Sequence, residues 1–169
     1  MRNLYHYTSA ETADAILNGE SLEPRSAICI PDLPKVNWFI RVPAWANKEK
    51  KYLFCFLDDP RTSAWSDGAV VQRLFEYIDS PRIALLRFTV EGATRRAHVL
   101  EGNLVREMAA FNTGIANGRI VINPYRCVQN YLDSRVALTQ YRGNYVLPEV
   151  IFQESVPSES VSLVEMKNP

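Results

Sequence analysis

This chain of 169 residues contains only two histidines, and one of them stands at an informative place. His6 lies in the stretch LYHYTS, where aromatic and polar side chains alternate as in a short strand that leads into a helix. A neutral imidazole offers one donor and one acceptor, so it can orient a bound ligand. A lone histidine on a strand is nevertheless more often a half-buried structural residue, and His98 has the same interpretation with weaker surroundings.

The usual signatures of enzyme sites are missing. The seven glycines are scattered singly, and neither GxGxxG nor GxxxxGK[ST] occurs. GxSxG and HExxH are absent as well. Cys29, Cys55 and Cys127 lie far apart, without a CxxC or Cys/His pairing, which indicates buried thiols in a reducing compartment and argues against structural zinc. We therefore expect no metal site.

Periodicity and turn signals predict the elements that would position His6. Residues 3–8 form a strand, and the T-x-x-E pattern from Thr8 to Glu11 predicts a capping box in which these two side chains satisfy the first free amides of a helix. Asn18-Gly19 ends that helix. Further strands are predicted at 51–57, 83–90, 96–100, 145–153 and 160–164, helices at 69–78 and 102–117, and a helical or irregular stretch at 123–138.

Composition narrows the class of protein. The apolar fraction is 47%, the charged fraction is 22% and the formal net charge is +0, as expected for a folded globular domain that bulk charge does not hold to nucleic acid. The sequence contains no membrane-spanning apolar run and no signal peptide. We predict one domain over residues 1–169, of the α+β class with mostly antiparallel strand pairing.

Three segments together resemble the ADP-ribosyltransferase superfamily in its histidine-bearing branches. The first is LYHYTS, followed by a helix that ends in Leu-Asn-Gly and then by Ser-Leu-Glu-Pro. The second is YLFCF, which begins at Tyr52, with Pro-Arg-Thr at 60–62. The third is LPEVIF at 147–152, with Val-Pro at 156–157. Small bacterial toxin domains and the DNA-modifying toxins of toxin–antitoxin pairs are the branches that these segments are most similar to.

The resemblance implies a split antiparallel sheet with an NAD cleft between its halves, and it assigns roles to single residues. Glu149 would stabilise the oxocarbenium-like ribose that forms when nicotinamide leaves. Its competitor is Glu154, which stands five residues later and would point to the opposite face of a continuous strand. His6 would hydrogen-bond the ribose attached to adenine, and backbone groups of Tyr7 would hold the nicotinamide amide. Thr8 and Ser9, at the start of the first helix, would favour the pyrophosphate, although capping alone explains both residues.

The middle residue of the pattern stays open. Arg41 is the first choice for contacting the phosphates of NAD, and Arg61 is a second cation for the same role. Tyr52 is the candidate for stacking on nicotinamide, because Phe54 shares its side of the strand whereas Leu53 faces away. The competing interpretation of each is an ordinary surface arginine or core aromatic residue.

The resemblance implies mono-ADP-ribosyl transfer from NAD to a macromolecule, protein or nucleic acid, by a bacterial toxin or effector. A neutralising immunity protein or antitoxin is a further expected partner, and no membrane is expected. The protein would be cytoplasmic, or delivered into a target cell without a cleaved signal peptide. An NAD glycohydrolase and a non-catalytic binding module with the same fold are the alternatives.

The transferase and the glycohydrolase interpretations both require the same arrangement of two side chains. His6 and Glu149 must face each other across a single cavity, and side chains on opposite faces of the sheet would argue against both activities.

Overall fold

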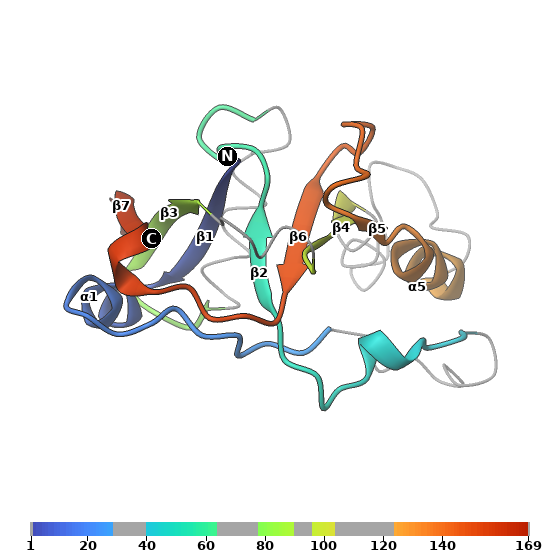
Figure 1. Ribbon diagram of the computed structural model, residues 1–169, viewed down its shortest axis with the longest axis horizontal. Coiled ribbons are helices and arrows are strands. Elements are labelled where there is room, and N and C mark those ends of the chain that lie inside the picture. Colours follow the sequence, from blue (N-terminus) through green and yellow to red (C-terminus); the bar gives the residue numbers. More distant parts are fainter. Residues whose placement is uncertain (1, 29–39, 64–77, 90–95, 104–123, 169) are drawn as a thin grey trace.

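The computed structural model describes residues 2–28, 40–63, 78–89, 96–103 and 124–168 (Figure 1). The helices predicted at 69–78 and 102–117 lie outside the described residues apart from their ends. The same is true of Cys29, whereas Cys55 and Cys127 are both free thiols. Among the described residues, no helix is long and apolar enough to cross a membrane.

A seven-stranded sheet forms the centre of the molecule, in the strand order β5-β4-β6-β2-β1-β3-β7. Every pairing in it is antiparallel. The prediction of an α+β fold with mostly antiparallel strands is therefore confirmed. The elements, in chain order, are β1 (Asn3–Ser9), α1 (Ala10–Leu17), η1 (Ala44–Ala46), β2 (Leu53–Phe56), β3 (Ile83–Thr89), β4 (His98–Glu101), α5 (Pro124–Asp133), β5 (Val136–Ala137), β6 (Pro148–Phe152), η3 (Ser158–Ser160) and β7 (Val161–Lys167).

Strand β3 explains why the sequence IALLRFT reads as a strand without alternation. It lies between β1 and β7, and its first four residues are all buried. Side chains on both faces of an interior strand are covered, so both faces are apolar. The two-residue strand β5 was not predicted, because a segment of that length carries no periodic signal.

The first helix begins one residue later than the capping box requires. Ser9 is its N-cap, and the Ser9 hydroxyl accepts a hydrogen bond from the N–H of Thr12 at 3.1 Å. Thr8 is still part of β1, where it pairs with Ala84. The predicted Thr8–Glu11 capping box is therefore wrong, because the β1 ladder continues through Thr8. The predicted end of the helix is confirmed at Asn18 and Gly19, whose φ of +117° suits glycine.

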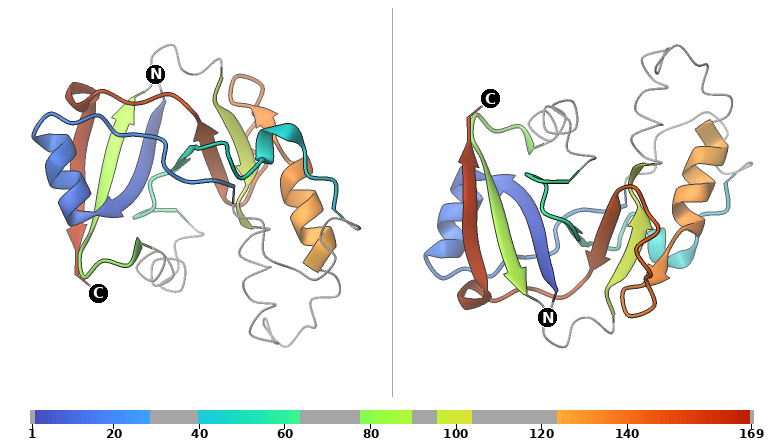
Figure 2. Two further views of the ribbon diagram at one scale, coloured as in Figure 1. Left: turned by 90° about the horizontal axis from the view of Figure 1, so that it is seen from below. Right: turned by 90° about the horizontal axis from the view of Figure 1, so that it is seen from above.

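The sheet is divided between β1 and β2. These strands share one register pair, Tyr5 with Phe56. By contrast, β1 pairs with β3 at seven positions, and β2 pairs with β6 at four. Figure 2 shows β1, β3 and β7 at one side of the molecule and β6, β4 and β5 at the other, with β2 between them. The described strands form one seven-stranded sheet, and its shortest join is this single pair between β1 and β2.

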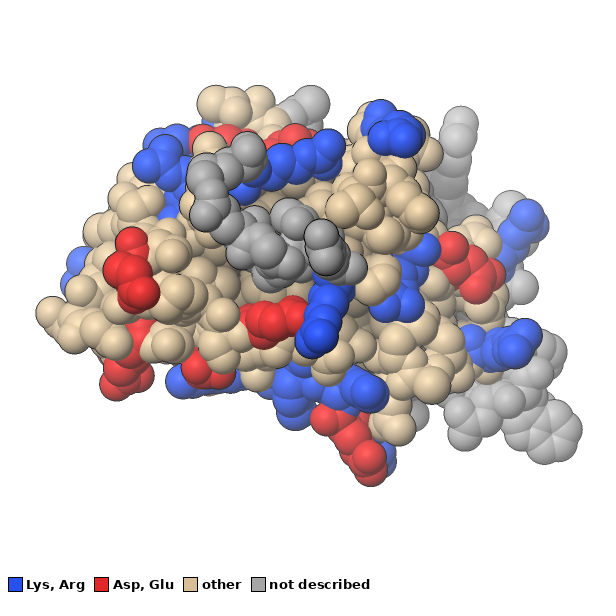
Figure 3. Space-filling view, viewed as in Figure 1, with Lys and Arg blue, Asp and Glu red and all other residues tan. Residues whose placement is uncertain are grey.

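Each face of the sheet carries its own core. On one face a continuous apolar cluster includes Ala13 and Ile16 of α1 and runs from Leu86 on β3 to Val99 on β4. The other face has two separate clusters, one with α5 and η1 over β4 and β6 and one around Tyr5 and the β3 strand. Figure 3 shows basic and acidic side chains scattered over the surface in view rather than gathered in one basic area.

Candidate functional site

The directions of the main-chain groups identify a break in the hydrogen-bonded ladder between β1 and β2, which is called the opening below. The N–H of Ala10 donates to the carbonyl of Arg82 at 3.0 Å, which extends the β1–β3 ladder by one pair. Hydrogen-bonded and non-bonded pairs alternate along an antiparallel ladder. The main-chain N–H and C=O of Tyr7 therefore point away from β3 and toward β2.

The same reasoning fixes the facing side of β2. The N–H of Leu57 donates to the carbonyl of Pro148 at 3.2 Å, in register with the β2–β6 ladder. The main-chain groups of Phe54 consequently point away from β6 and toward β1. A regular ladder would pair Tyr7 with Phe54, but the two strands pair only at Tyr5 and Phe56.

The side chain of His6 occupies the place of the missing pair. Its Nδ1 lies 2.7 Å from the carbonyl oxygen of Phe54. A carbonyl only accepts hydrogen bonds, so Nδ1 carries the proton and Nε2 is left as an acceptor. Burial lowers the pKa of His6, and the hydrogen bond with Phe54 opposes that shift. At neutral pH His6 is therefore an uncharged ring with one nitrogen committed to β2.

Glu149 stands near the start of β6 and is half-buried. Its Oε2 accepts a hydrogen bond of 2.7 Å from the hydroxyl of Tyr131 on α5. Burial raises the pKa of Glu149 to about 6, and the hydrogen bond from Tyr131 works in the opposite direction. A perturbed carboxyl group with one fixed hydrogen-bond donor is a candidate for catalysis. Sequence reasoning missed Tyr131, because no local pattern shows which helical tyrosine meets a distant strand.

His6 and Glu149 leave the sheet on opposite faces. Directly paired residues share a face, so the pairs Tyr5–Phe56 and Phe56–Glu149 place Glu149 on the face of Tyr5. Side chains alternate along a strand, which directs His6 to the other face. The register thus contradicts the expectation that His6 and Glu149 line one face.

The distance between strands β1 and β6, which carry His6 and Glu149, is nevertheless short. Two interstrand spacings separate β1 from β6, which is about 10 Å between backbones. A ligand confined to one face of the sheet meets only one of these two side chains.

The remaining residues of the YHYTS segment have structural partners. The Ser9 hydroxyl is committed to the helix cap and to Thr12 Oγ1, which lies 3.0 Å away. Thr8 lies in the β1–β3 ladder. The ring of Tyr7 is 6% exposed and packs edge-on against Phe56, with ring centroids 6.2 Å apart. Burial is the main cause that raises the pKa of Tyr7 to about 12, so its hydroxyl stays protonated.

Of the three middle candidates, Tyr52 is buried and Arg41 contacts α5. The side chain of Tyr52 is 6% exposed, and its hydroxyl donates to the carbonyl of Trp45 at 2.6 Å. A buried ring of this kind has no free face for nicotinamide, so Tyr52 serves the core. Arg41 is exposed, and its N–H binds the Gln129 side chain of α5 at 2.8 Å. This contact places Arg41 beside the α5 end of the sheet.

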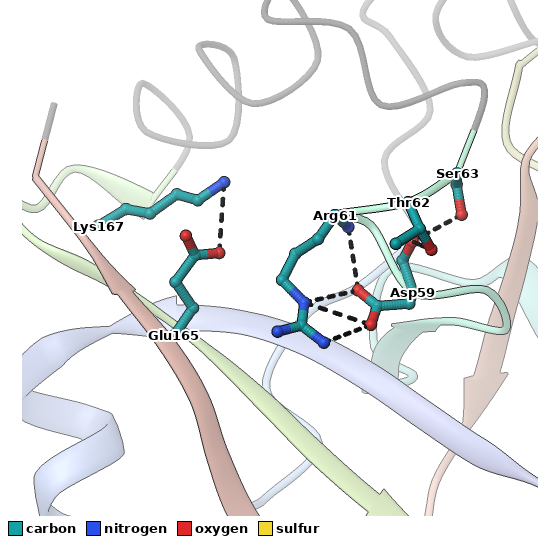
Figure 4. Close-up of polar contacts among 6 residues, drawn as sticks. All are labelled: Asp59, Arg61, Thr62, Ser63, Glu165 and Lys167. Atoms are coloured by element: carbon teal, nitrogen blue, oxygen red, sulfur yellow. Dashed lines mark hydrogen bonds and ion pairs between the residues drawn. The ribbon is translucent and has the colours of Figure 1, made fainter.

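Arg61 stands closer to β1, in the turn that follows β2 (Figure 4). Its Nη2 lies 2.6 Å from Oδ2 of Asp59, and its Nε donates to both oxygens of the same carboxylate. Charges of Asp59 and Arg61 both act on the pKa of Tyr7. Arg61 is therefore the arginine candidate nearest to Tyr7, but its charge is already paired with Asp59.

A shallow pocket of about 440 Å³ lies beside the joint between the two halves, and neither His6 nor Glu149 is part of its wall. It is lined by Arg2, Leu57, Asp58, Tyr141, Arg142, Gly143, Tyr145 and Pro148. The described part of the chain contains no group of three or more His, Cys, Asp or Glu side chains that could hold a metal ion.

Comparisons with protein-family models, with curated proteins and with solved structures find no match to this chain. The site is therefore interpreted from its own geometry and chemistry.

Proposed function

We propose that the protein is a mono-ADP-ribosyltransferase that moves ADP-ribose from NAD to a macromolecular acceptor and releases nicotinamide. In this reaction the bond between the ribose C1′ and the nicotinamide nitrogen breaks, and the bonding electrons leave with nicotinamide. The acceptor then bonds to C1′ and loses a proton. The residues that support the proposal are His6, Tyr7 and Glu149.

The opening between β1 and β2 is the observation that carries the proposal. The main chain of Tyr7 presents an N–H and a C=O to this opening, without a strand partner on that side among the described residues. A carboxamide such as that of nicotinamide has one acceptor and a pair of donors, so it complements such an edge. The hydrogen bond from Nδ1 to Phe54 leaves Nε2 of His6 as an acceptor, which suits a ribose hydroxyl.

Glu149 supplies the charge that the reaction needs. The ribose passes through a state with positive character at C1′, which a half-buried carboxylate stabilises more strongly than it would in water. Tyr131 holds the carboxylate in one orientation through its 2.7 Å hydrogen bond. Loss of Glu149 is therefore expected to reduce turnover more than NAD binding.

The opposite-face register is the arrangement stated above to argue against both enzymatic activities, and it favours a second candidate function, a non-catalytic binding module with the same fold. In that case Glu149 is a structural partner of Tyr131, and His6 only closes the gap between β1 and β2. An NAD glycohydrolase, in which water replaces the acceptor, uses the same residues as the transferase and differs only in its product.

Release of nicotinamide separates these candidates. Purified protein is incubated with NAD in the presence of cell lysate, DNA or RNA, and the products are followed by chromatography and mass spectrometry. The transferase produces nicotinamide and an acceptor heavier by one ADP-ribose, whereas the glycohydrolase produces free ADP-ribose. Absence of nicotinamide with every acceptor would leave the binding module.

Matched variants test the residues. Glu149→Gln keeps the shape and removes the charge, and it is expected to lower turnover at least 100-fold with little change in NAD affinity. Glu154→Gln is the control: Glu154 is partly exposed, its Oε1 lies 3.6 Å from Nη1 of Arg96, and its Oε2 accepts a hydrogen bond from the N–H of Gln153 at 3.2 Å. Equal release by wild type and Glu149→Gln would reject the assignment of Glu149.

The proposed setting is a bacterial toxin or effector that acts in the cytoplasm of a producing or target cell, with a neutralising immunity protein or antitoxin as its partner. Growth arrest on expression of wild type, and its loss in Glu149→Gln, would support that setting.

A further inference from the structure

Arg135 is a cation held in an unusual environment at the β5 end of the sheet. It lies two residues beyond the end of α5, and its guanidinium carbon is 4.8 Å from the centroid of the Trp45 ring. Its Nη2 lies 3.1 Å from Nδ1 of His98 on β4. Figures 1 and 2 show η1, which contains Trp45, next to the end of the sheet where β5 and α5 lie.

The charge of Arg135 has no acidic partner among the described residues. No ion pair joins it to a carboxylate in the described part of the chain. Burial lowers the pKa of Arg135, and the charge of Tyr52 opposes that shift. Its Nε is buried without a hydrogen-bond partner, and its Nη1 takes part in no described hydrogen bond. A half-buried cation without a counter-charge is unfavourable unless a ligand supplies one.

His98 does not neutralise this charge. A guanidinium only donates, so Nδ1 of His98 must be the acceptor and the ring is neutral, with its proton on Nε2. Burial and the charge of Arg135 both lower the pKa of His98. Trp45 supplies only the weak attraction of its ring for a cation. The cluster therefore orients the guanidinium, and none of the described residues compensates its charge.

Three lysines follow Trp45 closely in the sequence. The segment that brings Trp45 to this place continues through exposed Lys48, Lys50 and Lys51, against the single acid Glu49. A planar guanidinium donates parallel N–H bonds to the oxygens of an oxyanion such as phosphate.

We propose that Arg135, framed by Trp45 and His98, is the centre of a binding site for a phosphate-type oxyanion. The site does not depend on NAD chemistry at Glu149 and stands whether or not the protein is a transferase. The competing explanation is structural: a cation near the C-terminus of α5 interacts favourably with the helix dipole. The two explanations predict opposite effects of removing the charge.

Binding is tested with inorganic phosphate at constant ionic strength, with chloride as the exchanged anion. The fluorescence of Trp45 and the Tm are followed, and Trp45→Phe identifies the reporter among the three tryptophans of the chain. Wild type is expected to show a saturable fluorescence change and a rise in Tm. A flat titration with no rise in Tm would overturn the proposal.

Two variants separate ligand binding from helix stabilisation. Arg135→Met keeps the stem and removes the charge; it is expected to weaken phosphate binding at least tenfold and to leave the Tm in chloride equal to or above that of wild type. Arg135→Lys keeps the charge without the planar fork, and several-fold weaker binding is expected. Arg142→Met, at an exposed arginine, is the control and should bind as wild type does. Unchanged phosphate affinity in Arg135→Met and Arg135→Lys would overturn the proposal, as would a lower Tm of Arg135→Met without any phosphate effect.

The source of the anion is addressed by adding adenosine 5′-monophosphate in parallel. Equal affinity for phosphate and the nucleotide would show that the anion alone is recognised. Tighter binding of the nucleotide, lost in Arg135→Met, would assign the site to a nucleotide phosphate. Both results support an oxyanion site at Arg135.

Discussion

The raised pKa of Glu149 predicts how the free energy of unfolding changes with pH, whatever the function of the protein is. Burial raises its pKa from the ordinary value of 4.5 to about 6 in the folded protein. At about 1.36 kcal/mol for each unit of pKa, this rise corresponds to about 2 kcal/mol of folding free energy. The folded state therefore holds a proton that the unfolded state has already released between these two pH values.

The sign of the effect follows from linkage. Below about pH 4.5 Glu149 is protonated in both states, so its contribution is fully present there. As the pH rises through about 6, the folded protein must ionise a half-buried acid, and the contribution is lost. Wild type is thus expected to lose about 2 kcal/mol relative to Glu149→Gln between about pH 4.5 and 7.

Urea unfolding measured across this pH range is the assay, with the difference between wild type and Glu149→Gln as the reported quantity. Taking the difference cancels the titration of the other groups that the two proteins share. Glu154→Gln is the control for removing one carboxylate charge, because the Glu154 side chain pairs with Arg96 near the surface. If the difference between wild type and Glu149→Gln does not change with pH, the inference that burial raises the pKa of Glu149 is refuted.

Tyr131 provides an independent check on the same group. Its hydroxyl donates to Oε2 of Glu149, and hydrogen bonds to a charged group contribute about 1.5–3 kcal/mol. Tyr131→Phe is expected to raise the pKa of Glu149 further, as read from the carboxyl carbon by NMR titration, and to lower stability above pH 7. An unchanged titration curve would show that the hydrogen bond does not stabilise the carboxylate.

Three further predictions concern His6, the first helix and the buried thiol. His6→Phe removes the hydrogen bond to the carbonyl of Phe54 and is expected to reduce the unfolding free energy by about 1–3 kcal/mol. Because burial lowers the pKa of His6 in the folded protein, the stability of wild type should also fall as the pH drops below about 6.5. If His6→Phe shows the same pH dependence of stability as wild type, the lowered pKa of His6 is excluded. Ser9→Ala removes the N-cap of α1 and should reduce the unfolding free energy by about 1 kcal/mol, whereas Thr8→Ala removes no cap and should not cause this loss. If Thr8→Ala lowers the Tm more than Ser9→Ala does, the capping box predicted from the sequence is correct after all. Cys55 is buried and its pKa is well above the ordinary value, so it should react with thiol reagents only after unfolding, and rapid modification in the native state would contradict its position in the core.

Much of the fold could be predicted because its signals are local. The first helix and its end at Gly19 follow from a few neighbouring residues, and strands such as β3 follow from apolar runs of strand length. The capping box failed for a reason that no local pattern contains. The β1 ladder with β3 keeps Thr8 extended, so the next residue becomes the cap.

The sequence predicted which residue types make up the candidate site, but not how their side chains are placed. The sequence alone determined that a histidine and a glutamate stand on two strands, with no metal motif or phosphate loop to compete with them. Tertiary structure decided the rest. The register between β1, β2 and β6 set the opposite faces of His6 and Glu149, and packing of α5 brought Tyr131 to the carboxylate. These outcomes depend on contacts between residues far apart in the chain, and a shift of one residue in a strand register moves every side chain to the other face.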